Sequence, residues 1–354
     1  MKVVVAIDSF KGCLSSAEAD EAAAAGVRSA CPDADIRQVV VSDGGEGFLE
    51  AFQAAVGGEM VEVPVLDPLE RPIKARYLLC SEGLAVIEMA QASGLTLLKP
   101  EERNPLLTTT YGTGQLVVDA VKRGARHIIV GLGGSATSDA GQGMLRALMD
   151  SYAHQPDAIQ RFKGVGFTIA TDVKNPLYGE NGAAHVFGPQ KGATPEMVEQ
   201  LDAEARAFAE ASAQYFGYDR SEAEGAGAAG GLGYAFLQYL GADCQPGIEL
   251  LLEAAGFDEL VGDADLIITG EGSADRQTLM GKLPMGILRH AADVPVCLIA
   301  GRISHADTLL SAGFTHVECI NPPDMPLEEA MRKEVAQQHI QETIAKILTN
   351  KLYV

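Results

Sequence analysis

Four short segments of this chain combine glycine with charged or small polar side chains, and each directly follows a run of apolar residues. Such residues can bind a small polar or anionic ligand, because carboxylates hold metal ions and Lys or Arg meets phosphate and carboxylate groups. The segments are Asp8-Ser9-Phe10-Lys11, Ser42-Asp43-Gly44-Gly45-Glu46-Gly47, Gly270-Glu271-Gly272-Ser273-Ala274-Asp275-Arg276-Gln277 and Gly301-Arg302.

Three further glycine-rich segments lie in the middle of the chain. Residues 131–141 follow an apolar run and precede a predicted helix, an arrangement in which backbone N–H groups can cradle an anion. Residues 225–231 match G-x-G-x-x-G, but no strand precedes them, so a flexible turn that caps a helix is an equally good interpretation. Residues 188–193 place Lys191 on a turn, where it would meet a phosphate or only solvent.

Several common site motifs are absent from the sequence. It contains no G-x-x-x-x-G-K-[ST] phosphate loop, no H-R-D or D-F-G of protein kinases, and no G-x-S-x-G of serine hydrolases. The six cysteines form no C-x-x-C pair and the seven histidines no H-x-x-x-H pair, which argues against zinc and against a disulfide framework. The cysteine pattern suits a reducing compartment.

The charge balance excludes several partners. The 354 residues carry a formal net charge of −21, which disfavours nucleic acid and anionic membrane surfaces. The sequence shows no signal peptide and no apolar stretch long enough to span a membrane. Binding of an anionic substrate would need local cations, backbone N–H groups or a metal ion to reverse the potential.

The apolar runs predict the elements that position these loops. Residues 3–7, 36–41, 266–269, 296–300 and 316–320 are typical of buried parallel strands, with helices between them and a long amphipathic helix over 327–352. Ser15 and Glu18 are spaced as a capping box. Because ligands bind beyond the carboxyl ends of parallel strands, all four charged loops are expected along one edge.

The middle of the chain has a different pattern. Residues 60–64, 73–79 and 85–89 predict short antiparallel strands, and residues 127–130 and 167–170 predict two more strands. Helices are expected near 114–123, 196–215 and 232–240. We therefore expect an α/β protein with a five-stranded parallel domain built from residues 1–59 and 260–354, and an inserted mixed-sheet α/β domain over 60–259.

The motifs together resemble the bacterial glycerate kinase family, in order and over almost the whole chain. One departure is Ala6-Ile7-Asp8-Ser9, where the family usually has Ala-Pro-Asp-Ser, and another is the stretch 149–167, which is shorter than usual. The matching segments are Ala6-Ile7-Asp8-Ser9-Phe10-Lys11-Gly12, Ser42-Asp43-Gly44-Gly45-Glu46-Gly47, Glu88-Met89-Ala90, Arg103-Asn104-Pro105-Leu106, Gly133-Gly134-Ser135-Ala136-Thr137, Thr171-Asp172-Val173, Gly188-Pro189-Gln190-Lys191-Gly192, residues 225–231, and Thr269-Gly270-Glu271-Gly272 with Asp275 and Lys282.

The resemblance implies a flavodoxin-like domain and an ATP- and Mg²⁺-dependent kinase that phosphorylates D-glycerate at the 2-hydroxyl, in a cleft between two domains. It further implies a cytoplasmic enzyme whose partners are glycerate and ATP, and it leaves a homodimer open.

Roles follow for individual residues as hypotheses. Asp43, Asp172 and Asp275 are candidates for holding Mg²⁺ and for accepting the hydroxyl proton, and Lys11 completes the catalytic set. For any one of these aspartates, a helix cap or turn is the structural alternative. Substrate or phosphate contacts are expected from Asp8, Ser9, Glu46, Gly133, Gly134, Ser135, Asp139, Lys191, Gly227, Gly230, Glu271, Arg276 and Lys282.

Two other functions stay open at this point. The shortened stretch after Met149 is compatible with a family member that has lost activity and binds a small hydroxy acid as a sensor. A doubly wound nucleotide-dependent dehydrogenase is a second alternative, although G-x-G-x-x-G is missing after Ile7.

Overall fold

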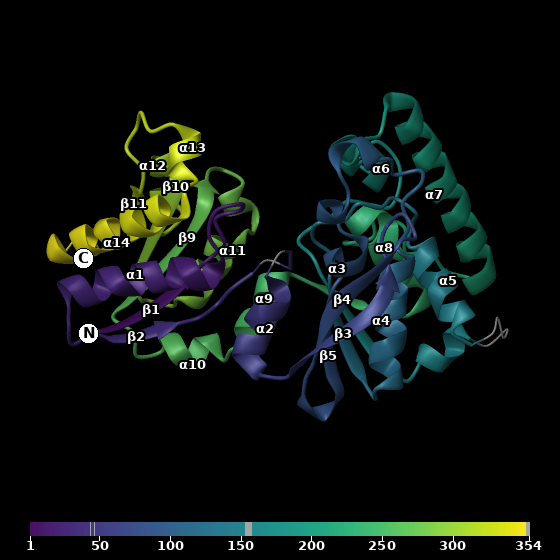
Figure 1. Ribbon diagram of the computed structural model, residues 1–354, viewed down its shortest axis with the longest axis horizontal. Helices are drawn as coiled ribbons and strands as arrows, with labels where there is room; N and C mark the ends of the chain where they lie inside the picture. Colours follow the sequence, from purple (N-terminus) through teal and green to yellow (C-terminus); the bar gives the residue numbers. More distant parts are fainter. Residues whose placement is uncertain (43, 46, 153–157, 352–354) are drawn as a thin grey trace. The chain divides into compact units, whose positions relative to one another are not determined.

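The computed structural model describes residues 1–42, 44, 45, 47–152 and 158–351. The chain forms two compact units (Figure 1). Unit 1 consists of Met1–Asp43, Glu50–Val56 and Ile248–Val354, and unit 2 consists of Gly44–Leu49 and Gly57–Gly247. Both ends of the chain therefore build unit 1. Compared with the expected boundaries at 59/60 and 259/260, unit 1 also takes residues 248–259, and unit 2 takes the glycine-rich segment from Gly44.

Unit 1 contains the five-stranded parallel sheet that the apolar runs predicted. Its strands are β1 (Lys2–Ile7), β2 (Asp35–Gln38), β9 (Leu266–Ala274), β10 (Val296–Ile303) and β11 (His316–Cys319). They lie in the order β2-β1-β9-β10-β11, and every pairing is parallel. This is the flavodoxin-like order, in which the direction of winding reverses between β1 and β9.

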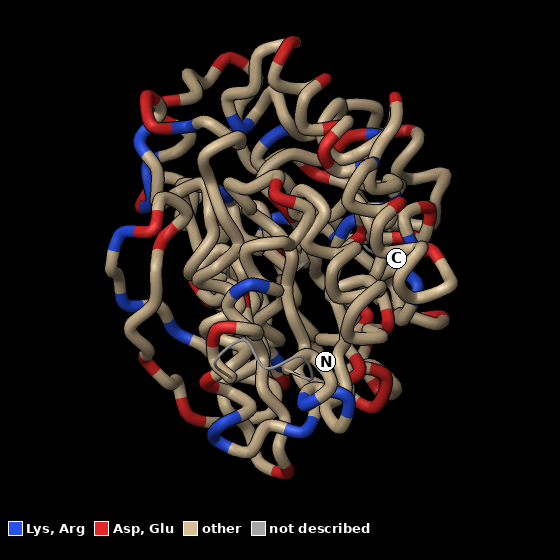
Figure 2. Tube along the Cα trace, turned by 90° about the vertical axis from the view of Figure 1, so that its right-hand side faces the viewer, with Lys and Arg blue, Asp and Glu red and all other residues tan. Residues whose placement is uncertain are grey.

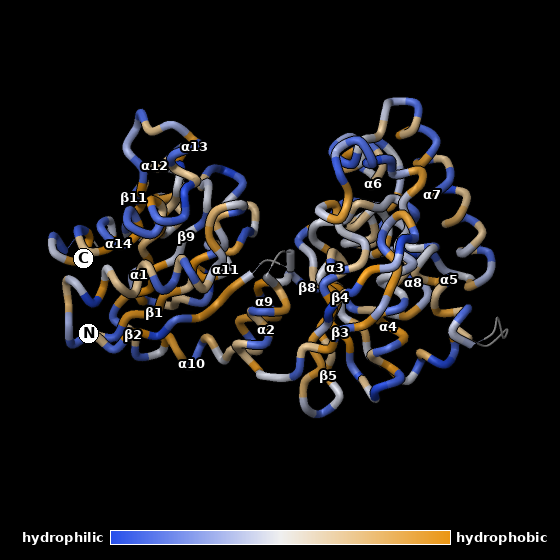
Figure 3. Tube along the Cα trace, viewed as in Figure 1, coloured by the Kyte–Doolittle hydropathy of each residue, from blue (hydrophilic) through white to orange (hydrophobic). Residues whose placement is uncertain are grey.

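Helices cover this sheet and close its core. The contact between α1 (Ser16–Ala30) and α14 (Lys333–Thr349) buries Val27 and Ile344 with the strand residues Val5 and Ile268. The hydropathy colouring shows the same concentration of apolar residues along the strands (Figure 3). The capping box of Ser15 and Glu18 is present at the start of α1. The remaining helices are α9 (Gly247–Ala254), α10 (Phe257–Val261), α11 (Leu283–His290), α12 (Ala306–Ser311) and α13 (Leu327–Ala330), with most of α2 (Phe48–Val56).

The expectation of one helix over 327–352 is wrong. The chain forms α13 and then α14, and Arg332 between them has an extended backbone (φ −74°, ψ 128°). No side chain of α13 is buried, whereas α14 buries Ala336, Ile340 and Ile347. Helices of this length depend on tertiary packing for their stability, so only the second segment is held along α1.

Unit 2 contains a mixed six-stranded sheet. The strands β3 (Glu59–Leu66), β4 (Pro72–Leu79) and β5 (Leu84–Glu88) are antiparallel to one another, as the sequence predicted. The strands β6 (His127–Gly131), β7 (Gly166–Ala170) and β8 (Asp243–Gln245) then continue from β5 in parallel. The sequence did not predict β8, because three residues are too few to show a period.

Helices pack around this second sheet. Its core joins Leu116 of α4 (Tyr111–Lys122), Met144 of α5 (Gln142–Asp150) and Phe236 of α8 (Leu232–Tyr239) with strand residues. The long α7 (Pro195–Phe216) begins with Thr194 as its cap, and its side chain accepts the N–H of Met197. Two shorter helices complete the unit, α3 (Ala90–Ser93) and α6 (Ala183–Phe187).

The surface charge is dispersed. Along the described part of the trace, acidic residues are spread out and interspersed with Lys and Arg (Figure 2). In the described part of the chain, no helix is both long and apolar enough to cross a membrane.

His290 of α11 should make the stability of unit 1 depend on pH. Its ring nitrogens lie 2.6 Å from an Asp258 oxygen and 2.7 Å from a Glu249 oxygen, and Glu249 also pairs with Arg289 at 3.4 Å. Burial acts to lower the pKa of His290, but the two carboxylates outweigh it and the pKa lies above its ordinary 6.5. The stabilisation is therefore complete below pH 6.5 and is lost as pH rises through the raised value.

The expected loss in the free energy of unfolding is at most about 1 kcal/mol, because Asp258 is exposed and its charge is screened by solvent. Urea denaturation across this pH window measures it, with His290→Gln as the comparison. The free energies of unfolding of wild type and variant should differ less at alkaline pH than at acid pH. A difference that stays constant with pH would contradict the prediction.

Candidate functional site

In unit 1 the loop after β1 lies against the carboxyl-terminal residues of β9, which in turn approach those of β10. The N–H of Asp8 donates to the carbonyl of Gly270 at 2.9 Å. A methyl group on Gly272 would lie 3.6 Å from Phe10 Cα, and one on Gly301 would lie 2.8 Å from the Gly272 oxygen. Three of the charged segments predicted to share an edge therefore lie within van der Waals distance of one another. The expectation that residues 270–274 and 301–302 are loops is wrong, because they extend β9 and β10 and pair as Arg302 with Ser273.

Glu271 is the central carboxylate of this edge. It is 6% exposed, its Oε1 accepts the Thr278 hydroxyl at 2.6 Å, and its Oε2 lies 3.4 Å from Lys282 Nζ. Burial raises the pKa of Glu271, while the bonds from Thr278 and Lys282 act in the opposite direction. The Lys282 ammonium thus neutralises a buried carboxylate, and its side chain keeps 38% exposure toward solvent.

The remaining predicted residues of unit 1 lie on the same loops. Asp275 is half-buried, and its Oδ1 accepts the Gln277 N–H at 2.7 Å, which is the turn role foreseen as the alternative to catalysis. Asp8 likewise accepts the N–H of Ser9 at 2.8 Å. Lys11 and Arg276 are exposed.

Asn321 is a residue of this edge that the sequence did not single out. Its Nδ2 donates to the carbonyl of Gly301 at 2.8 Å, and its Oδ1 lies 2.9 Å from His339 Nδ1 of α14. This chain of contacts ties the end of β10 to α14. In the sequence, an Asn followed by Pro322 predicts only a turn. The role of Asn321 is shown by its hydrogen bond to the Gly301 carbonyl, 20 residues away.

In unit 2 the glycine-rich loop 131–141 follows β6. Its residues are bound on several sides: Gly133 donates to Gly44 at 3.2 Å, and Ala136 donates to Ser93 at 2.9 Å next to a bridge between Ser135 and Gly94. Gly134 has φ +74°, a conformation that glycine adopts without strain. The segment from Gly44 thus lies against this loop.

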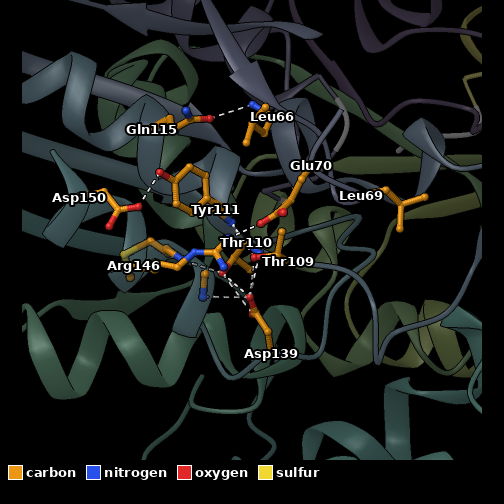
Figure 4. Close-up of polar contacts among 12 residues, drawn as sticks. Leu66, Leu69, Glu70, Thr109, Thr110, Tyr111, Gln115, Asp139, Arg146 and Asp150 are labelled. Carbon is orange, nitrogen blue, oxygen red and sulfur yellow. Dashed lines mark hydrogen bonds and ion pairs between the residues drawn. The ribbon is translucent and has the colours of Figure 1, made fainter. Parts of the chain in front are cut away.

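Asp139 has a structural function inside that loop (Figure 4). Its carboxylate accepts the N–H of Thr110 at 2.8 Å, the Thr110 hydroxyl at 2.9 Å, and the N–H groups of Gly141 and Gly143 at 3.0 and 3.1 Å. It therefore caps the start of α5 and joins it to the start of α4. These donors surround both oxygens, so a substrate contact by Asp139 stays a prediction.

Lys191 is buried and contacts the same loop. Its side chain is 2% exposed, and Nζ donates to the carbonyl of Thr137 at 2.6 Å. Burial lowers the pKa of Lys191 to about 7, while the Asp139 charge acts in the opposite direction. In this conformation the amine supports the loop from inside, whereas the sequence had placed it on a turn near phosphate or solvent.

Gly227 and Gly230 lie where the second glycine-rich segment packs against its neighbours. A methyl group on Gly230 would be 2.0 Å from the Thr137 oxygen, and one on Gly227 would be 2.3 Å from the Pro176 oxygen. No strand precedes this segment, so it is a packed turn before α8. Both glycines are needed for close backbone packing.

The three candidate metal ligands are not brought together within one unit. Asp275 belongs to unit 1, Asp172 is exposed after β7 in unit 2, and Asp43 lies outside the described residues, as does Glu46. Within the described ranges, no group of three His, Cys, Asp or Glu side chains is arranged to hold a metal ion.

Lys191→Met should change how the stability of the protein depends on pH. An unfolded lysine binds a proton up to about its ordinary pKa of 10.5, whereas the buried amine releases it near pH 7. Between these values the unfolded state binds more protons, so the free energy of unfolding rises with pH by up to about 1.4 kcal/mol per unit. The Met variant lacks this rise, and denaturant titrations of both proteins between these two pH values test it. Parallel curves would show that the amine titrates normally.

The fold is that of an α/β protein, with charged and glycine-rich segments at the carboxyl ends of its parallel strands, the edge at which ligands bind in such sheets. The family model described as the glycerate kinase family matches residues 3–158 and 151–351. A glycerate kinase from Bacillus subtilis (strain 168) is 43% identical, covering 98% of this chain and 97% of its own, and a glycerate 2-kinase from Escherichia coli (strain K12) is 40% identical, covering 86% of each. A crystal structure from Salmonella typhimurium LT2, described as a glycerate kinase 2, superposes with a TM-score of 0.84 at 38% identity, covering 99% of this chain and 98% of the other.

The chain belongs to the glycerate kinase family. The alignment with the Bacillus subtilis protein spans 371 positions, more than the 354 residues of this chain, so it contains gaps on this side. The two matches of the family model meet at residues 151–158, inside the stretch that the sequence showed to be short.

Proposed function

We propose that this protein transfers the γ-phosphoryl group of ATP to the 2-hydroxyl of D-glycerate. The hydroxyl oxygen forms a bond to the γ-phosphorus, the bond from that phosphorus to the β–γ bridging oxygen breaks, and ADP leaves. The hydroxyl proton passes to a carboxylate. The family membership carries the proposal, and the relative named glycerate 2-kinase favours the 2-hydroxyl.

The residues of unit 1 fit the electrostatic needs of this reaction. Phosphoryl transfer depends on positioning and on neutralising the charge of the phosphate oxygens. Lys11 and Arg276 are exposed on segments of the same sheet edge, and the Lys282 ammonium balances Glu271. We assign the acceptance of the hydroxyl proton to Asp275, which is half-buried and lies at the point where the winding of the sheet reverses.

Mg²⁺ would accompany ATP in this proposal. It would shield the phosphate charges, and carboxylates of the kind offered by Asp275, Asp172 and Asp43 are the ligands it prefers. Asp275 Oδ1 accepts the Gln277 N–H, and within the described ranges no Lys or Arg forms an ion pair with Asp275. All six cysteines are free thiols, which suits the cytoplasm.

The test is the formation of ADP that depends on D-glycerate, followed by identification of the product. Wild-type protein with MgATP should form ADP and 2-phosphoglycerate, and L-glycerate serves as the control acceptor. Formation of 3-phosphoglycerate would correct the hydroxyl, and calorimetric binding of D-glycerate without ADP formation would favour the sensor function instead. The shortened stretch over 149–167 is the observation that suggests this alternative.

A further inference from the structure

We infer that unit 1 holds the nucleotide, with the adenine ring on the apolar face of α13 and the phosphates toward Lys11 and Lys282. This rests on the proposed function. It assigns ATP to unit 1.

The topology of unit 1 provides the place. Its strand order reverses between β1 and β9, and in such sheets the ligand lies in the crevice at that point. Lys11 lies on the loop that leaves β1, Glu271 lies near the carboxyl end of β9, and its partner Lys282 follows β9. Gly272 lets the loops approach, since a methyl group there would be 3.9 Å from the Lys11 nitrogen.

Exposed apolar side chains adjoin these cations. Leu327 is the first residue of α13 and Met331 directly follows its last, so the two are about one helical turn apart, and they are 74% and 42% exposed. Met331 Cε would be 3.3 Å from a methyl group on Gly12, which places it directly beside Lys11. Met280, on the loop that carries Lys282, is 83% exposed.

An aromatic base suits this combination. Thioethers contact ring systems favourably by about 0.3–1.5 kcal/mol, and methionine adapts its shape to a flat ligand. Small-molecule sites combine apolar lining with a few placed charges, as Met331 and Lys11 do here. Exposed apolar side chains next to cations in a chain of net charge −21 therefore match an anion that carries an apolar ring.

Unit 2 is less suited to a triphosphate. In its loop 131–141, the N–H groups of Gly133, Ala136 and Ala140 donate to Gly44, Ser93 and Gly230. The N–H of Gly141 and that of Gly143, in the first turn of α5, donate to Asp139. The single lysine against the loop, Lys191, is buried and donates to the Thr137 carbonyl. These N–H and ammonium donors therefore already form hydrogen bonds within unit 2.

Oxidative footprinting of the wild-type protein tests the assignment without any mutation. Hydrogen peroxide converts exposed methionine to its sulfoxide, and mass spectrometry measures the rate at each site. Saturating MgADP should slow the oxidation of Met331 and Met280 several-fold. Met149 of unit 2, which is 40% exposed, is the matched control and should oxidise at an unchanged rate. D-glycerate alone should protect none of the three.

A variant pair gives a second readout by calorimetry of MgADP. Met331→Asp should weaken ADP binding about tenfold, because a carboxylate then faces the base and the phosphates, and Met331→Leu should stay within about twofold. Val186→Asp in α6 alters a side chain of similar exposure, 45%, and should leave ADP binding unchanged. Thermal unfolding confirms that each variant is folded.

The outcomes separate this inference from the proposed function. If ADP protects neither Met331 nor Met280, or protects Met149 instead, the nucleotide does not bind on unit 1 as inferred, even when the wild-type protein forms ADP from ATP and glycerate. If ADP protects Met331 while no glycerate-dependent ADP forms, the nucleotide site is supported and the proposed reaction fails.

Discussion

Asp275→Asn is expected to lower kcat for D-glycerate at least about 100-fold, the range typical for loss of a general base. The amide keeps the size of the side chain, and its oxygen can still accept the Gln277 N–H at the present 2.7 Å. The turn is therefore preserved, and the free energy of unfolding should change by less than about 1 kcal/mol. Steady-state ADP release and urea denaturation measure the two quantities.

Asp33→Asn is the matched control for this change. Asp33 is exposed just before β2, at the opposite edge of the same sheet. The kcat of the Asp33→Asn variant should therefore equal that of wild type. If Asp275→Asn retains more than a tenth of wild-type kcat while folded, Asp275 acts only as a turn residue. The proton would then pass to another carboxylate, and Asp172→Asn is the next variant to measure.

Gly230→Ala is expected to destabilise the protein by about 2–4 kcal/mol. The new methyl group would lie 2.0 Å from the Thr137 oxygen and 2.6 Å from Ser138 Cα, both of which are backbone atoms. The left-handed backbone at φ +66° adds about 1–2 kcal/mol of strain for any residue with a Cβ, and overpacking of a tight contact adds a similar amount. Moving Thr137 would also disturb the bond from Lys191, so glycerate turnover should fall.

Gly241→Ala separates the two causes. Gly241 has nearly the same φ, +65°, and a methyl group there would meet nothing within 4 Å. Gly241→Ala should therefore lower the free energy of unfolding only by the backbone strain, about 1–2 kcal/mol. Equal losses in the two variants, measured by urea denaturation, would mean that the close approach of Gly230 to Thr137 contributes nothing.

Strand positions and the charged edge of unit 1 were predictable because they depend on local patterns. Residues 3–7 and 266–269 are continuous apolar runs, and such runs become strands that are buried on both faces. Asp8, Glu271 and Arg302 follow these runs directly, so parallel strands place them along one edge. The alternation of the three segments after residue 59 likewise predicted antiparallel β3, β4 and β5.

Other features had no adequate local signal. β8 has only three residues, and the division between α13 and α14 contains neither proline nor glycine. Asn321 donates a hydrogen bond to a carbonyl 20 residues away, and the N–H of Thr110 donates to Asp139, which lies 29 residues further along the chain. Polar side chains of this kind are common in turns, so their partners cannot be found from spacing alone.

The sequence alone therefore determined the α/β class, the two sheets and the resemblance that the glycerate kinase comparisons confirmed, because apolar periodicity and ordered motifs are local properties. The tertiary structure decided what the charged residues of the glycine- and aspartate-rich loops contact. Lys191 meets a carbonyl 54 residues away, and Asp139 caps two helices, whereas Lys11 faces solvent beside Met331 and Gly12. The physical reason is burial, since a charged side chain binds whatever polar group the packing of distant segments brings to it.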